Sequence, residues 1–245
     1  VVAGNDDSGV GTIKGNKYTY LKVNSPESGE LTLKSGTIEG GIDVEQATLE
    51  AGKKITLTTG GANEKAGDVK HGGGRVTTDL LEVISQGKVE INASVEKLSA
   101  HLSGVHGLSL INDKNLVVDN AIVEKGELNL VVHGDLTVEG VLEARGGTDT
   151  DDIKVSLFPD IDIDSQNEGI WKFPAMMIKG SVSASGEGDV IVEGAARLIH
   201  DDLDKPINGD HLSLEIGAIA SGSIKSAGAY SVGEEVTINV YKIGT

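Results

Sequence analysis

One pattern of short alternating segments constrains the fold of this chain more than any other feature of the sequence. It is clearest in residues 126–147, GELNLVVHGDLTVEGVLEARGG. Leu128 and Leu130 alternate with polar residues, and after a glycine the pattern returns with Leu136 and Val138. Strict alternation over so few residues, broken by glycine, predicts β-strands rather than a helix. Strands this short cannot form a domain singly, so we expect them to stack on copies of themselves.

Copies of this pattern follow one another at a spacing near twenty residues. Ile91, Leu110 and Leu130 end successive strands, and they are 19 and 20 residues apart. Leu33 and Leu57, which we align with the same strand end, are 24 residues apart, and a polar loop lengthens the interval from Leu57 to Ile91 to 34. Such a period with turn glycines is typical of a solenoid, and the helical spacing of i, i+3, i+4 and i+7 is not sustained. The sequence therefore predicts an all-β fold, a β-solenoid with an aliphatic core.

The alternation in residues 126–147 also assigns a direction to each side chain. We expect the four aliphatic residues named above to point inward. The residues between them are expected to point outward: Glu127, Asn129, Asp135 and Thr137. Glycine suits the corners between strands, because tight turns need positive φ angles.

The organisation along the chain predicts one solenoid domain with interruptions. Residues 1–17 are rich in Gly and Asp and are predicted to form an irregular lead-in or cap, and residues 18–245 a single β-solenoid. Polar stretches break the rhythm three times, and they predict loop insertions at about 62–75, 148–174 and 200–210.

The composition restricts the partners of the chain. Its formal net charge is −17 and it has no basic stripe, so it repels phosphate backbones and anionic lipid headgroups. It also lacks a run of about 18 apolar residues. We therefore expect neither nucleic-acid binding nor membrane insertion. The absence of cysteine fits a bacterial secreted protein that crosses membranes unfolded.

Units such as GELTLKSGTIEGG, residues 29–41, and the 126–147 segment resemble the repeats of filamentous-haemagglutinin-like secreted proteins. The resemblance covers residues 29–147 well and 177–240 loosely. It implies a right-handed parallel β-helix, secreted or displayed at the bacterial cell surface, commonly by two-partner secretion. Such proteins act as adhesins, matrix proteins or toxin-carrying stalks, so the implied partners are surface glycans, proteins or copies of the chain itself. The family's secretion domain carries an Asn-Pro-Asn-Gly-type motif, which this sequence lacks, so a repeat or distal segment, or a different β-helix family, is expected.

A cluster of acidic residues is the best candidate for a metal site. It comprises Asp160, Asp162, Asp164 and Glu168. Carboxylates at alternate positions share one face of a strand and repel each other unless a cation neutralises them, and Ca²⁺ accepts six to eight oxygen ligands. An EF-hand is excluded, because its sixth and twelfth positions are Ser165 and Trp171. The alternative is a solvated outer strand face, with Ile161 and Ile163 inside.

Three aromatic residues beside this cluster are the candidate ligand-binding residues. They are Phe158, Trp171 and Phe173, in a chain with only 3% aromatic residues. An exposed aromatic ring beside carboxylates is a common way to hold a sugar ring. The alternative is that these rings pack on the flank of the solenoid or cap one of its ends.

We find no constellation of residues that predicts catalysis. His71–Gly74 imitates an esterase oxyanion motif, but no Gly-x-Ser-x-Gly nucleophile elbow is present. No catalytic residue carries over from the family resemblance either. The leading hypothesis is therefore a non-enzymatic structural or adhesive module, a stiff rod that presents loops. The competing hypotheses are a polysaccharide lyase or hydrolase, which 21 basic against 38 acidic residues disfavour, and a self-assembling filament subunit.

Overall fold

The computed structural model describes residues 13–14, 20–23, 28–35, 40–43, 47–60, 66–104, 106–163, 169–172, 174–195, 197–200, 207–216, 223–226 and 230–240. Every regular element in these ranges is a β-strand, so the predicted all-β class is confirmed. Helices long and apolar enough to cross a membrane are absent from this part of the chain.

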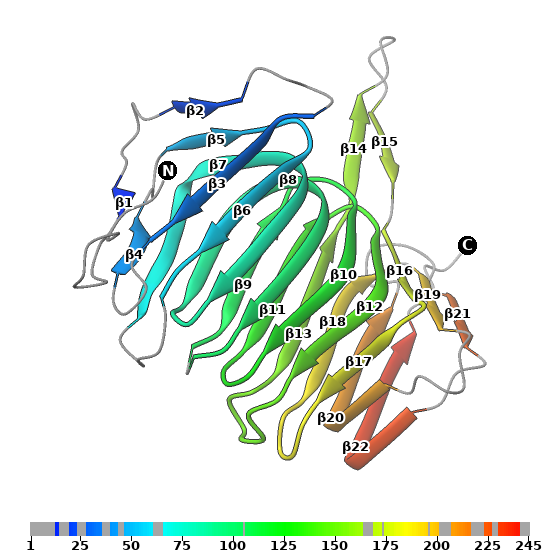
Figure 1. Cartoon of the computed structure of the whole chain (residues 1–245). Helices are drawn as coiled ribbons and strands as arrows, with labels where there is room; N and C mark the ends of the chain where they lie inside the picture. The colour runs from blue at the N-terminus through cyan, green and yellow to red at the C-terminus, as the bar shows by residue number, and fades with distance from the viewer. Residues whose placement is uncertain are drawn as a thin grey trace.

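The strands follow one another around a single solenoid (Figure 1). Their bounds are β1 (Ile13–Lys14), β2 (Tyr20–Lys22), β3 (Glu30–Lys34), β4 (Gly40–Asp43), β5 (Thr48–Glu50), β6 (Lys54–Thr58), β7 (Ala66–Ser85), β8 (Val89–Leu102), β9 (Leu108–Asn112), β10 (Leu116–Val123), β11 (Leu128–His133), β12 (Leu136–Ala144), β13 (Ile153–Phe158), β14 (Asp160–Ile163), β15 (Gly169–Lys172), β16 (Ala175–Ile178), β17 (Ser181–Ala184), β18 (Val190–Ala195), β19 (Arg197–His200), β20 (Ile207–Ile216), β21 (Ser223–Ser226) and β22 (Tyr230–Val240). Among them, twenty belong to one sheet and β14 and β15 form a second.

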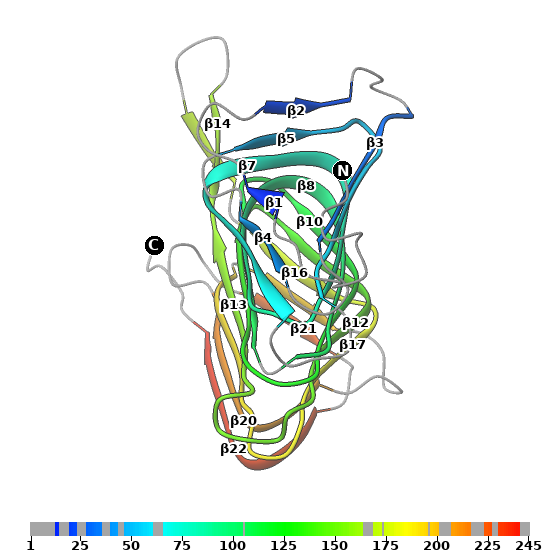
Figure 2. The ribbon, with the colours of Figure 1, turned by 60° about the vertical axis from the view of Figure 1, so that its left-hand side comes forward.

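All pairings within the large sheet are parallel, as a coil stacked on the next coil requires. One stack of strands is used below and is called face A. It runs through β1, β4, the first part of β7 and of β8, then β9, β11, β13 and β18, and ends with the second part of β20 and of β22. Long strands such as β7 and β8 turn a corner and contribute to more than one face (Figure 2). The fold is a parallel β-helix.

The register confirms the spacing predicted in the middle of the chain. Leu110 pairs with Ile91 on one side and with Leu130 on the other. Leu33 pairs with Leu57, also as expected. The alignment of Leu57 with Ile91 is wrong, because Leu57 pairs with Val83. Leu33 and Leu57 lie on a different face of the solenoid from Ile91. Strand β7 runs along the face of Ile91 first and reaches the face of Leu57 afterwards.

An aliphatic core fills the interior of the solenoid. Leu128, Leu130, Leu136 and Val138 are fully buried, as predicted. The intervening residues in this segment are half-buried or exposed, which confirms the assignment of the two faces. Burying each such Leu or Val contributes about 1.5–3 kcal/mol, and the identical inward positions of successive coils repeat that contribution along the axis.

Glycines serve two different purposes in the coils. Gly126 and Gly134 have φ angles of 105° and 131°, a conformation that side chains disfavour, as the corner argument predicts. Gly107 is needed for another reason. A Cβ atom there would lie 2.1 Å from the backbone oxygen of Glu127 in the next coil. Close approach between coils therefore selects glycine even where the φ angle does not.

The predicted interruptions are shorter in the structure. Ile153–Phe158, which we placed within an insertion at 148–174, forms strand β13 and pairs with β11 and β18 as a regular part of face A. The predicted insertion was too long, because the polar residues of the turn before Ile153 do not indicate that the next coil begins there. Strands also begin inside the other three irregular segments, 1–17, 62–75 and 200–210, at Ile13, Ala66 and Ile207.

Candidate functional site

A hairpin leaves the solenoid at the end of β13 and returns at β16. Its strands β14 and β15 are antiparallel, with Asp160 opposite Lys172 and Ile161 opposite Trp171 in the register. Figures 1 and 2 show that this hairpin extends away from the body of the solenoid. It is the one antiparallel pairing among the described strands, and it is therefore the clearest candidate for a site of interaction.

The first end of the hairpin is fixed by an aromatic stack. The rings of Phe158 and His133 lie 5.2 Å apart between centroids at an interplanar angle of 23°. Next to this stack, the backbone N–H of Gly134 donates to the carbonyl oxygen of Phe158 over 3.0 Å. Phe158 nevertheless remains 43% exposed, so one side of its ring is open to solvent.

The second end of the hairpin is fixed by a carboxylate. The backbone N–H of Ala175 donates to Oδ1 of Asp135 over 2.7 Å. The backbone N–H of Asp135 in turn donates to Oδ1 of Asn115 over 2.8 Å. Two hydrogen bonds thus link three successive coils at this corner, where the hairpin rejoins the solenoid.

The acidic residues predicted to bind Ca²⁺ fall on this hairpin only in part. Asp160 and Asp162 lie in β14. Asp164 and Glu168 lie outside the described residues. Within the described part of the chain, no group of three or more His, Asp or Glu residues could hold a metal ion. The calcium site stays a prediction.

The aromatic residues predicted to bind a ligand are also only partly placed. Phe158 ends β13, Trp171 lies in β15, and Phe173 lies outside the described residues. Sequence reasoning missed His133, the partner of Phe158. A signal for it existed, because aligning Leu128 with Ile153 places His133 opposite Phe158 in the register.

A buried carboxylate closes the corner before β13. Asp151 is only 3% exposed and accepts hydrogen bonds from the backbone N–H groups of Gly126 and Thr148, and from the hydroxyl of Thr148. Burial opposes the ionisation of this group, but the hydrogen bonds outweigh burial and hold the pKa of Asp151 below its usual value. The carboxylate is fully engaged within the protein, so its role is to shape the corner.

A family comparison agrees with this architecture. The model of the haemagglutinin repeat matches residues 27–93 and 84–157, which together cover more than half of the chain. The chain belongs to the haemagglutinin repeat family. This confirms the resemblance inferred from the repeats and makes the chain an adhesin-like β-helix module. The family is associated with secreted or cell-surface proteins and is typically non-enzymatic. No curated protein and no solved structure gives a significant match.

The haemagglutinin repeat match and the hairpin occupy adjoining parts of the chain. The second match ends at residue 157, and Phe158, the first residue of the hairpin base, follows directly. The matched coils run from β3 to β13, and parallel stacking continues beyond them through β16 to β22. The hairpin lies outside the matched residues, as do the coils that follow it.

Proposed function

We propose that the chain is a non-enzymatic structural and adhesive module of a secreted bacterial surface protein. In this proposal the β-helix is a stiff rod, and the β14–β15 hairpin is held out from its flank to contact a surface glycan or protein. Membership of the haemagglutinin repeat family supports the adhesin-like part of the proposal.

The observation that carries the proposal is the continuity of the coils on both sides of the hairpin. Leu136 pairs with Met176, which follows the hairpin, and Ile153 pairs with Val190. Stacking therefore resumes in register, and the core does not depend on the hairpin. Loops that vary on a rigid scaffold are where binding functions concentrate.

The form of the hairpin also favours a contact with a partner. A two-stranded hairpin is marginally stable on its own, and its outer edges carry backbone N–H and C=O groups suited to pairing with another chain. A partner that covers such an edge would supply the missing strand contacts. The fixed base at Phe158 and Ala175 reduces the entropy lost on such binding.

Replacing residues 160–172 by a short Gly-Ser linker tests the proposal. We expect the far-UV circular dichroism and the melting temperature to stay close to those of the parent protein. Beads coated with the variant should lose their adhesion to epithelial cells or to bacteria. The control is the double substitution Glu96→Ala and Lys97→Ala at exposed positions of β8, which should keep full adhesion.

Two results would contradict the proposal. Unchanged adhesion without residues 160–172 would show that the hairpin is not the contact site. Reproducible turnover of a polysaccharide that a single carboxylate substitution abolishes would show that the module is an enzyme.

A further inference from the structure

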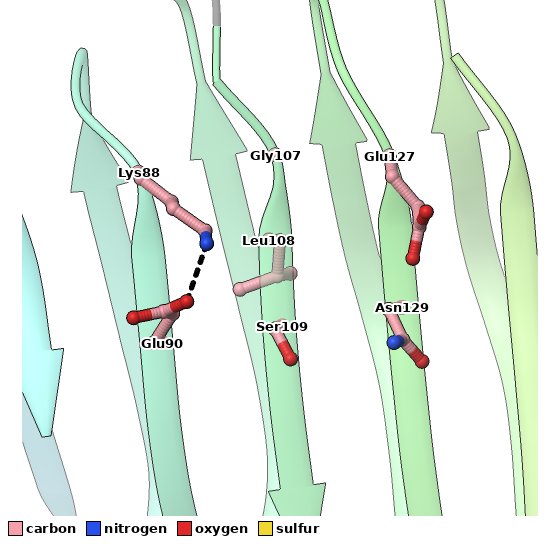
Figure 3. A pocket seen from close by; sticks show the side chains of 7 residues that line it. All are labelled: Lys88, Glu90, Gly107, Leu108, Ser109, Glu127 and Asn129. Carbon is pink, nitrogen blue, oxygen red and sulfur yellow. Dashed lines mark ion pairs between the residues drawn. The ribbon is translucent and has the colours of Figure 1, made fainter. Parts of the chain in front are cut away.

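A shallow groove lies on the outer surface of face A, and Figure 3 shows the residues that line its first hollow. Its first hollow has a volume of about 290 Å³. Lys88 and Glu90 form one wall, and Glu127 and Asn129 form the other. The floor is the segment 107–109, where glycine has no side chain and serine has a short one. Small residues in one coil thus open a hollow between the larger residues of its two neighbours.

A second hollow continues the groove toward the C-terminus. It has a volume of about 150 Å³ and shares Asn129 with the first. Lys154 and Ser156 line it on β13, and Ile191 and Glu193 line it on β18. The two hollows cross five consecutive strands of face A, namely β8, β9, β11, β13 and β18. Four inter-strand spacings of about 4.8 Å give the groove a length of about 19 Å along the axis.

Most charges of the groove are neutralised within the protein. Lys88 forms an ion pair with Glu90. Lys154 binds Glu127 over 2.9 Å and Asp152 over 3.3 Å. The hydrogen bond that Lys154 donates to Glu127 raises the pKa of Lys154, so this ammonium group stays charged and paired. The lining of the groove has two lysines against three glutamates, so the groove carries only a small negative charge in a chain of net charge −17. Outside the ion pairs, the groove offers the hydroxyl groups of Ser109 and Ser156, the amide of Asn129 and one exposed carboxylate, that of Glu193.

An apolar strip runs beside the groove on the same face. It consists of Ile111, Val131, His133 and Phe158, each two or four positions further along its strand than a groove residue. Ile111 and Phe158 are each 43% exposed, although large apolar side chains are usually covered. Ile111 pairs with Val131 between β9 and β11, and His133 stacks on Phe158 between β11 and β13, so the strip consists of two adjoining pairs; the partner of Val131 in β13 is Ser156. Face A therefore presents a polar groove and an apolar strip side by side.

We infer that face A binds a neutral, extended oligosaccharide that lies along the solenoid axis. The hydroxyl groups of the sugar would bond to Ser109, Asn129 and Ser156, and its C–H surfaces would pack against the apolar strip. The spacing between coils is close to the length of one pyranose ring, so each sugar would meet a new coil. The outward residues in register along the axis are Glu90, Ser109, Asn129, Lys154 and Ile191. This site lies on the solenoid and shares only the base residues His133 and Phe158 with the hairpin, and it does not depend on the adhesive role proposed for the hairpin.

Other classes of ligand fit this face less well. An anionic polysaccharide or a nucleic acid would meet a negative molecule whose local cations are already paired. An extended peptide that binds by strand addition needs a free sheet edge, but β9 and β11 are paired on both sides. A neutral sugar needs neither free charges nor a free edge.

Isothermal titration of the whole chain with cellohexaose and hexa-N-acetylchitohexaose, two neutral extended hexasaccharides, tests the inference. At least one should bind, with an affinity that changes little with salt, and hexagalacturonate should bind more weakly. Asn129→Ala and Ser109→Val, which remove the amide and fill the hollow, should each weaken binding at least about tenfold. Matched controls on other faces, Asn120→Ala and Thr137→Val, should leave the affinity unchanged.

Amide chemical shifts provide a test that does not depend on the variants folding. The bound hexasaccharide should shift resonances of residues 107–111, 127–133 and 153–158 in the parent protein. The inference is overturned if neither neutral hexasaccharide binds at millimolar concentration, if hexagalacturonate binds more tightly, or if the shifts map to strands β14 and β15 or to another face. Binding that survives both groove substitutions would overturn it as well.

Discussion

The side-chain amide of Asn112 forms the backbone hydrogen bonds that Val95 would otherwise make with a neighbouring strand. Its Oδ1 accepts from the N–H of Val95 over 2.9 Å, and its Nδ2 donates to the carbonyl oxygen of Val95 over 3.0 Å. The same Nδ2 donates to the carbonyl oxygen of Lys114 over 2.7 Å. Asn112 is fully buried, so one side chain replaces a strand where β9 ends and β8 continues around the corner.

Replacing Asn112 by Leu should strongly destabilise the fold. The substitution keeps the size of the side chain but leaves up to three backbone groups without partners. Each buried group without a hydrogen bond costs about 1–3 kcal/mol in the free energy of unfolding. Urea denaturation measures the loss, and Asn129→Leu at an outward, half-buried position is the matched control, with an expected change within about 0.5 kcal/mol. Equal losses in both variants would mean that the bonds of Asn112 contribute little.

The inward and outward positions of one segment should differ in the same way. Leu130 is fully buried and stacks between Leu110 and Val155. Leu130→Ala should lower the free energy of unfolding by about 2–5 kcal/mol, because the removed methyl groups leave a cavity between two coils. Thr137→Ala, at an outward position of β12, should cost much less. Denaturation curves that shift by the same amount for both substitutions would show that the assigned faces are wrong.

Local alternation is enough to predict the strands of the coils. It is not enough to assign every strand to the correct face of the solenoid. The pairing of Ile91 with Leu110 follows from the constant spacing in the middle of the chain. Leu57 was aligned with Ile91 because spacing alone cannot tell which face of the solenoid a strand occupies. A longer coil changes the spacing without changing the pattern, and the register with Val83 appears only in the structure.

The candidate sites show a similar limit. His133 could have been found by extending the alignment of Leu128 with Ile153 to the end of each strand. Asn112 could not have been found from the sequence, because an Asn followed by Asp at the end of a strand is also typical of a solvent-exposed turn. Its burial depends on the bend in β8, one coil earlier, which no local pattern indicates. The groove on face A likewise arises from residues of separate coils.

Asp151 should make the stability of the solenoid depend on pH. Its pKa is below the usual value in the folded state, so ionised Asp151 contributes stability above the unfolded pKa of about 3.9. That stability is lost as the pH falls through the lower folded pKa. Asp151→Asn should destabilise the protein at pH 7. The new NH₂ group would face N–H and O–H donors, from which the carboxylate accepts hydrogen bonds. The difference should shrink below about pH 4.

Urea denaturation between pH 7 and pH 2 measures this dependence. Asp149→Asn, at an exposed position of the same turn, is the control and should match the parent protein at every pH. A constant difference between Asp151→Asn and the parent protein over the whole range would show that ionisation of Asp151 does not contribute.

Calcium should order the hairpin if the acidic residues of β14 and the following loop share a cation. The prediction depends on the alternate aspartates at positions 160, 162 and 164, and on Trp171, the only tryptophan, which lies in β15 of the same hairpin. Adding Ca²⁺ should shift the tryptophan fluorescence and raise the melting temperature, because a ligand that binds only the folded state stabilises it by mass action. Replacing all three aspartates by Asn should remove both responses. The triple control Glu96→Gln, Asp119→Asn and Glu139→Gln, at carboxylates on the solenoid itself, should retain them. If millimolar Ca²⁺ changes neither signal in the parent protein, the aspartates are a solvated strand face, and the hairpin makes its contacts without a metal.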